Sequence, residues 1–232
     1  MPLHERIGAW LVDYGYVLRG YASMMAHREP PAHYLGHVVP ERAPVILIPG
    51  ILNTWAFMKR LGDRISFAGH PVYVIPELGY NIHDIPTSAQ KLRSLIEKEG
   101  LSGVVLVAHS KGGLIGKYLL AHYDTDDRVS GMVAIAAPFS GSALAELVPH
   151  RALAELRADS EIVKDLEGHR AVNARIFSII PEYDNHVWAE RGSVLEGAAG
   201  NIDVPVSGHH KTLFSEPVSQ AVLGAIENLK KR

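Results

Sequence analysis

The feature that most constrains this chain is a strand, a turn that carries a serine, and a helix in direct succession. Residues 104–108 read Val-Val-Leu-Val-Ala, an apolar run typical of a parallel strand that is covered on both faces. Ser110 follows, and apolar residues recur at helical spacing from Leu114 onward. Gly112 and Gly113 allow the helix to approach the strand closely, because they have no Cβ. We therefore expect Ser110 to sit on a tight turn at the top of a sheet, with its Oγ exposed.

Further apolar runs predict the rest of this sheet. They are residues 45–50, 72–76, 132–138, 175–181 and 202–206. Helical patterns separate them, most clearly over 54–67, 84–99 and 216–229. This alternation predicts an α/β fold: a mostly parallel central sheet of about six strands with helices on both faces. Ligands of such sheets bind beyond the carboxyl ends of the strands, so the functional residues should follow strands.

Composition narrows the classes of function. The chain has 232 residues and a formal net charge of -2, which gives it no electrostatic reason to bind nucleic acid. It contains no cysteine, which excludes disulfides, a thiolate nucleophile and a cysteine-ligated metal. No stretch is apolar for long enough to span a bilayer, and the first residues do not resemble a signal peptide. We expect one cytoplasmic domain over residues 1–232, with no cofactor.

One pair of histidines has metal-ligand spacing. His33 and His37 would share a helix face, but Pro30, Pro31 and Gly36 argue against a helix there. We therefore expect no metal site.

Two segments lie outside the sheet pattern. Residues 1–42 comprise an amphipathic helix, over 7–25, and a linker. That helix is either docked on the domain or serves as a mobile cover or a weak interfacial anchor, and sequence does not separate these alternatives. Residues 139–172 are a candidate small lid, and we expect no large cap domain. The charged run 124–128 is interpreted as a solvated loop.

A serine hydroxyl becomes a good nucleophile only when a base removes its proton and a carboxylate orients that base. In this fold the acid and the histidine should follow Ser110 in the chain, each after a strand. Asp184 lies in the loop after the strand 175–181, and Glu182 is the alternative acid. After the last strand come His209 and His210, of which only one can face the serine.

His109 adjoins the serine, and we interpret it as a packing or hydrogen-bonding residue.

Several short motifs together resemble the small, cap-less bacterial lipases of the α/β-hydrolase superfamily. They are Ala-His-Ser-Lys-Gly-Gly at 108–113, Asp-x-x-Val at 184–187, Leu-Glu-Gly-Ala at 195–198, Asn201, and Gly-His at 208–209 followed by Leu213 and Ser215. The register of this resemblance selects His209 as the base. It also implies that the backbone N–H groups of Ile51 and Lys111 form the oxyanion hole. The chain departs from the pattern at Lys111, usually an uncharged residue, and at Pro49, often a histidine.

We expect a serine hydrolase that cleaves small-molecule carboxylic esters, with medium to long acyl chains, through Ser110, His209 and Asp184. An acyltransferase, thioesterase or amidase would use the same residues, because all of these form an acyl-enzyme. A hydrolase fold used only for binding is the non-catalytic alternative. Sequence leaves the oligomeric state open.

Overall fold

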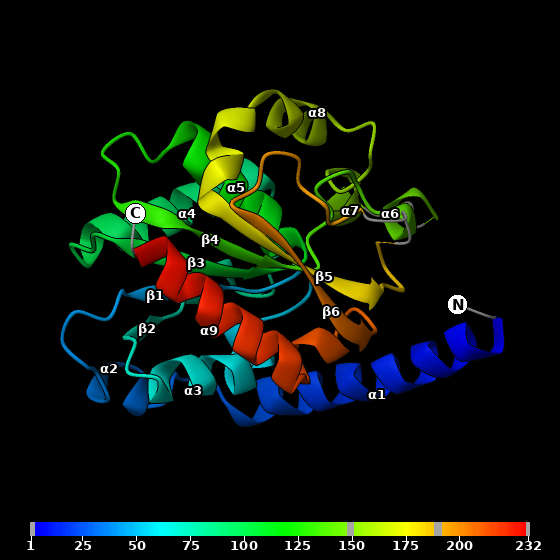
Figure 1. The fold of residues 1–232 in the computed structure, drawn as a ribbon, viewed down its shortest axis with the longest axis horizontal. Coiled ribbons are helices and arrows are strands. Elements are labelled where there is room, and N and C mark those ends of the chain that lie inside the picture. Colours follow the sequence, from blue (N-terminus) through cyan, green and yellow to red (C-terminus); the bar gives the residue numbers. More distant parts are fainter. Residues whose placement is uncertain (1–2, 148–150, 188–191, 231–232) are drawn as a thin grey trace.

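A computed structural model describes residues 3–147, 151–187 and 192–230. Its six strands form one parallel sheet in the order β2-β1-β3-β4-β5-β6 (Figure 1). The strands are β1 (Val45–Ile48), β2 (Val72–Tyr73), β3 (Val104–His109), β4 (Val129–Ile135), β5 (Ile176–Tyr183) and β6 (Gly200–Ser207). The sequence prediction of a parallel α/β sheet of about six strands is confirmed.

The serine-bearing strand β3 lies in the middle of the sheet. All six of its residues are buried, as its unbroken apolar sequence predicts. It pairs with β1 on one side and β4 on the other, with Ala108 opposite Ile48 and His109 opposite Ile135. The carboxyl ends of these three strands therefore meet at one edge, where Ser110 leaves β3.

Helices cover both faces of the sheet (Figure 1). Helices α4 (Ile85–Lys98), α5 (Lys111–His122) and α8 (Glu161–Gly168) enclose one apolar cluster, with the short helix η3 (Arg170–Arg175) beside α5. Helices η1 (Trp55–Met58), α3 (Lys59–Phe67) and α9 (Glu216–Lys230) enclose the other. Each strand of the middle of the sheet sends alternate side chains into the two clusters.

Some elements differ from their predicted form. The helix expected over 54–67 is divided into the 3-10 helix η1 and the α-helix α3. The strand expected over 72–76 keeps only the two residues of β2, and the 3-10 helix η2 (Pro76–Leu78) takes up the end of the expected run. The run 124–128 is only partly a solvated loop. The side chain of Asp124 is fully buried and accepts a hydrogen bond from Arg175 at 2.6 Å.

The expectation of no helix at His33 is wrong, because a single helical turn, α2 (His33–Gly36), forms there. His33 Nε2 lies 3.1 Å from Asp63 Oδ1, and His37 packs against Phe67. Both histidines thus have contacts within the chain that need no metal.

The candidate lid, 139–172, contains only short helices. These are α6 (Ala143–Leu147), α7 (Arg151–Ala154) and α8, while residues 148–150 lie outside the described part of the chain. No large cap covers the sheet edge in the described residues. Within those same ranges, no helix combines the length and the hydrophobicity needed to cross a membrane.

The N-terminal helix α1 (Leu3–Ala26) is docked on the domain. It packs on η1 and on the 3-10 helix η4 (Lys211–Phe214), and runs along the lower edge of the view in Figure 1. Gly20 is buried against the Phe57 ring, where an added Cβ would lie 2.2 Å from the ring. Trp10 Nε1 donates to the Tyr183 hydroxyl at 2.8 Å. Of the two roles left open by sequence, these contacts favour docking over a mobile cover.

Candidate active site

Ser110 occupies a strained turn between β3 and α5. Its backbone has φ 53° and ψ -123°, a conformation that non-glycine residues rarely adopt. The turn is held by the Ser110 N–H, which donates to Ile135 O at 3.0 Å. An added Cβ on Gly112 would lie 2.4 Å from Ile48 O, and one on Gly113 would lie 2.4 Å from the Ala137 Cβ. Only glycines therefore let α5 begin so close to the sheet, as the sequence predicted.

Asp184 and His209 form a largely buried pair, with side chains that are 11% and 4% exposed. The His209 Nδ1–H donates to Asp184 Oδ2 at 2.8 Å. The other carboxylate oxygen, Oδ1, accepts the N–H groups of His186 and Val187 at 2.8 and 2.9 Å. These bonds fix the carboxylate, and they leave the lone pair of His209 on Nε2. Glu182, the alternative acid, is exposed on β5.

The pair is also matched electrostatically. Burial alone would raise the pKa of Asp184, but attraction to His209 and its hydrogen bonds hold that pKa below the ordinary value. Burial would likewise lower the pKa of His209, but the Asp184 carboxylate outweighs it and raises that pKa. The Asp184 carboxylate therefore stabilises the imidazolium that forms when His209 accepts a proton.

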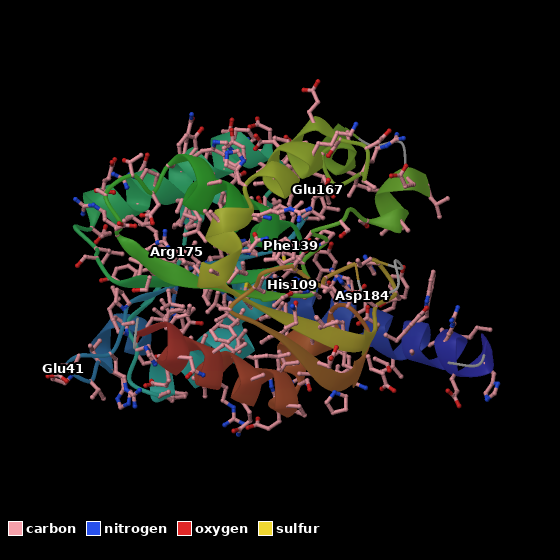
Figure 2. All side chains as sticks on the ribbon, turned by 45° about the horizontal axis from the view of Figure 1, so that its top comes forward. Glu41, His109, Phe139, Glu167, Arg175 and Asp184 are labelled. Atoms are coloured by element: carbon pink, nitrogen blue, oxygen red, sulfur yellow. The ribbon has the colours of Figure 1, made fainter. Side chains whose placement is uncertain are left out.

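His209 is held next to the serine turn by its backbone. Its N–H donates to Asn185 Oδ1 at 2.9 Å, and its carbonyl accepts from Thr212 Oγ1 at 2.6 Å. The same carbonyl lies 3.2 Å from His109 Nε2, so this nitrogen donates to it. The rings of His109 and His209 are 4.8 Å apart. Figure 2 shows His109 and Asp184 at the same end of the sheet.

His109 is fully buried, and burial holds its pKa well below the ordinary value, so the ring is neutral. His109, the residue before Ser110, thus joins the turn after β3 to the loop that carries His209 and His210, which we call the histidine loop. This agrees with the hydrogen-bonding role expected for His109.

The backbone around Ile51 lies close to the serine. An added Cβ on the preceding Gly50 would lie 3.2 Å from the Ser110 Cβ and 3.1 Å from His109 Nδ1. Lys111 is the first residue of α5, where backbone N–H groups have no partner within the helix. The loop after β1 and the start of α5 thus both face the region of the Ser110 side chain.

The Lys111 side chain has a structural explanation that the sequence did not offer. It is fully buried, and its Nζ donates to the carbonyls of Asn81 and His83. Asn81 Nδ2 in turn donates to Pro49 O at 2.7 Å. Burial lowers the pKa of Lys111. The unusual lysine therefore ties the loop at 81–83 to the start of α5, and Asn81 ties that loop to the end of β1.

Sequence reasoning missed a second carboxylate–histidine pair. Asp13, on α1, is fully buried, and its Oδ2 lies 3.0 Å from His210 Nδ1. Its Oδ1 accepts the N–H groups of His210 and Lys211, both at 2.8 Å. His210 thus faces α1 while His209 faces Asp184. The available signal was an acidic residue at position 13, between Trp10 and Val17 in the row of α1 that faces the domain.

Two groups of side chains in the described residues have metal-ligand spacing. One is Asp13 with His186 and His210, and the other is His122 with Asp165 and His169. In the first group both Asp13 oxygens already accept hydrogen bonds. In the second, His122 Nε2 lies 2.8 Å from Asp165 Oδ2, and the side chains are partly exposed. Neither group includes Ser110, Asp184 or His209.

Solved structures of other proteins have a similar fold. The mature form of lipase BlEst2 from Bacillus licheniformis superposes with a TM-score of 0.65 at 18% identity, over 84% of this chain and 95% of that one. A monoacylglycerol lipase from Paleococcus ferrophilus gives 0.58 at 16% identity, over 84% and 96%. No curated protein matches the sequence.

Such distant similarities show the fold alone. The sequence model of the alpha/beta hydrolase fold matches residues 43–167, which is more than half of the chain. The matched region includes β1 to β4 and the Ser110 turn, so the membership of the α/β-hydrolase superfamily that the short motifs implied is confirmed. The chain belongs to the α/β-hydrolase fold family.

Proposed function

We propose that this protein is a serine hydrolase that cleaves carboxylic esters. The observation that carries the proposal is the hydrogen-bonded Asp184–His209 pair. The His209 carbonyl of this pair accepts from His109, which directly precedes a serine on a strained strand-to-helix turn. Ser110 Oγ bonds to the acyl carbon while His209 Nε2 takes its proton. The ester C–O bond then breaks, and His209 gives that proton to the departing alcohol. Water, activated by the same imidazole, releases the acid and restores Ser110.

The oxyanion of each tetrahedral intermediate is held by the backbone N–H groups of Ile51 and Lys111. Both roles need only backbone, so an isoleucine and a buried lysine are compatible with them. Asp184 keeps the proton of neutral His209 on Nδ1 and stabilises the imidazolium that forms.

The proposed substrates are small-molecule esters with medium to long acyl chains. The absence of a large cap from the described residues supports this, because an open site admits a long chain, and each buried methylene contributes about 0.8 kcal/mol. Rates on p-nitrophenyl esters from acetate to palmitate test it. An enzyme fastest on acetate would be a short-chain esterase. Deletion of α1 is not a suitable control, because Asp13 supports the histidine loop.

The direct test of the reaction class is a matched ester, thioester and amide with one acyl chain. We expect the ester to give the highest kcat/KM. A preference for the thioester or amide, or for transfer to an added alcohol over water, would favour the alternative hydrolases or an acyltransferase. A folded protein inactive on all of them would favour a binding function.

The identity of the base is tested by a pair of variants. His209→Ala should reduce turnover to background, while His210→Ala should keep a measurable fraction, because His210 is bonded to Asp13 rather than to Asp184. The reverse result would exchange the two assignments.

A further inference from the structure

The outer face of α1 exposes a continuous apolar row. It consists of large side chains with exposed fractions between 38% and 77%: Ile7, Leu11, Tyr14, Leu18, Tyr21 and Met25. A different row of the helix, including Trp10, Asp13 and Gly20, makes the contacts with β5, η4 and η1. Docking of α1 on its own domain therefore leaves the outer row uncovered.

The spacing of this row is that of a helix partner. Successive members are alternately four and three residues apart, the repeat that places a and d side chains along the seam between two packed helices. The row from Ile7 to Met25 lies within 24 residues of continuous helix and spans almost three such repeats. A scattered set of exposed apolar residues would need no explanation, but a seam of this regularity does.

Small residues flank the row at heptad spacing. Gly8, Gly15 and Ala22 are seven residues apart. An added Cβ on Gly8 or Gly15 would meet nothing within 4 Å, whereas one on Gly20 would collide with Phe57. Each interior glycine weakens a helix by about 1 kcal/mol relative to alanine. Packing within the subunit explains Gly20 only, and the close approach of a second helix would explain the other two.

We propose that α1 pairs with α1 of a second copy of this chain, antiparallel, across a two-fold axis near the middle of the row. A two-fold axis pairs one surface with itself, and the row is symmetric about its centre in spacing. Antiparallel packing also brings opposite ends of the two helix dipoles together. The six side chains expose roughly 700 Å² in total, close to the ~800 Å² that each partner buries in a stable interface.

The charges of α1 favour a protein partner over a lipid surface. Helices that lie in membrane interfaces carry Lys and Arg on their polar face. Here the arginines Arg6 and Arg19 lie over the rings of Tyr183 and Phe214 of the same subunit. The row itself contains no basic side chain that could bind an anionic headgroup.

Sedimentation velocity of the full chain tests the proposal. We expect a dimer that Leu11→Glu with Leu18→Glu weakens roughly hundredfold or more. Leu35→Glu is the matched control, because Leu35 is also exposed but lies on α2. Gly15→Leu should also weaken the dimer while leaving the monomer folded, since its Cβ meets open space.

Disulfide cross-linking tests the orientation of the two helices. Because the chain has no cysteine, the introduced residues are its only thiols. A mixture of Ile7→Cys and Met25→Cys proteins should form the mixed disulfide, and Ile7→Cys alone should not. Cross-linking of Ile7→Cys alone would refute the antiparallel pair. A wild-type monomer at high micromolar concentration would overturn the dimer, and its flotation with phosphatidylcholine vesicles would show that lipid covers the row instead.

Discussion

Replacement of Asp13 should destabilise the protein and slow turnover, although Asp13 is 97 residues before Ser110 in the chain. Its carboxylate is fully buried and accepts the N–H groups of His210 and Lys211 and the His210 ring. Asp13→Ala leaves the two backbone N–H groups buried without an acceptor. Each such group costs about 1–3 kcal/mol, so the two together give an expected loss in the free energy of unfolding of about 2–6 kcal/mol.

Asp13→Asn is the informative partner variant. Its amide oxygen can still accept both N–H groups, so the expected loss is about 1 kcal/mol. Burial alone would raise the pKa of Asp13, but its contacts with His210 and Lys211 hold it well below the ordinary value. A lowered pKa gives stability that is present above the unfolded pKa of about 3.9 and is lost as pH falls through the folded pKa. The advantage of the wild type over Asp13→Asn should therefore shrink in acid.

Urea unfolding and steady-state kinetics measure both effects. Glu5→Ala, an exposed acid on the same helix, is the control and should change stability by less than about 0.5 kcal/mol. Because Asp13 holds the loop that carries His209, folded Asp13→Ala protein should lose roughly tenfold in kcat with a smaller change in KM. A loss of stability below about 1 kcal/mol in Asp13→Ala would refute the role assigned to these hydrogen bonds.

Three further predictions follow from single contacts. Asp184→Asn should lower kcat about ten-thousandfold by imposing the wrong tautomer on His209, while a comparable loss in Glu182→Gln would exchange the acids. Gly112→Ala should lower the free energy of unfolding, measured in urea, by more than about 2 kcal/mol, because the added Cβ meets a β1 carbonyl. Gly168→Ala is the control, because a Cβ there meets open space. Equal losses in the two variants would contradict the packing argument. Burial lowers the pKa of Lys117 to about 8, so Lys117→Met should raise the free energy of unfolding at pH 7 by about 1–3 kcal/mol. That gain should shrink from about pH 8 and vanish near about pH 10.5, because wild-type stability rises where the unfolded chain binds more protons than the folded one. A gain that does not change with pH would contradict this prediction.

The middle of the sheet could be predicted from sequence because β1 and β3 are buried on both faces and read as apolar runs. Gly112 and Gly113 also predicted the close approach of α5 to β1 and β4. The ends of the strands were harder to predict. Strand β2 is shorter than its apolar run because the backbone turns into η2 at Pro76, which depends on tertiary context rather than on local hydrophobicity.

The site residues could be predicted where the order of strands and polar residues along the chain determines where they lie. Asp184 and His209 follow strands, and the structure brings them within hydrogen-bond distance. The contacts of Asp13 with His210 and of Lys111 with Asn81 join elements far apart in sequence. No spacing rule reports such contacts, because they depend on how α1 and the loop at 81–83 pack on the finished sheet.

The central claim is that Ser110 is an activated nucleophile, and labelling with a fluorophosphonate tests it most directly. Intact mass and peptide mapping should show one adduct, located on Ser110, in the wild type. The adduct should be absent from Ser110→Ala and should form far more slowly in His209→Ala, because the serine then lacks its base. Folded wild-type protein that stays unlabelled, or that is labelled at another residue, would contradict the account.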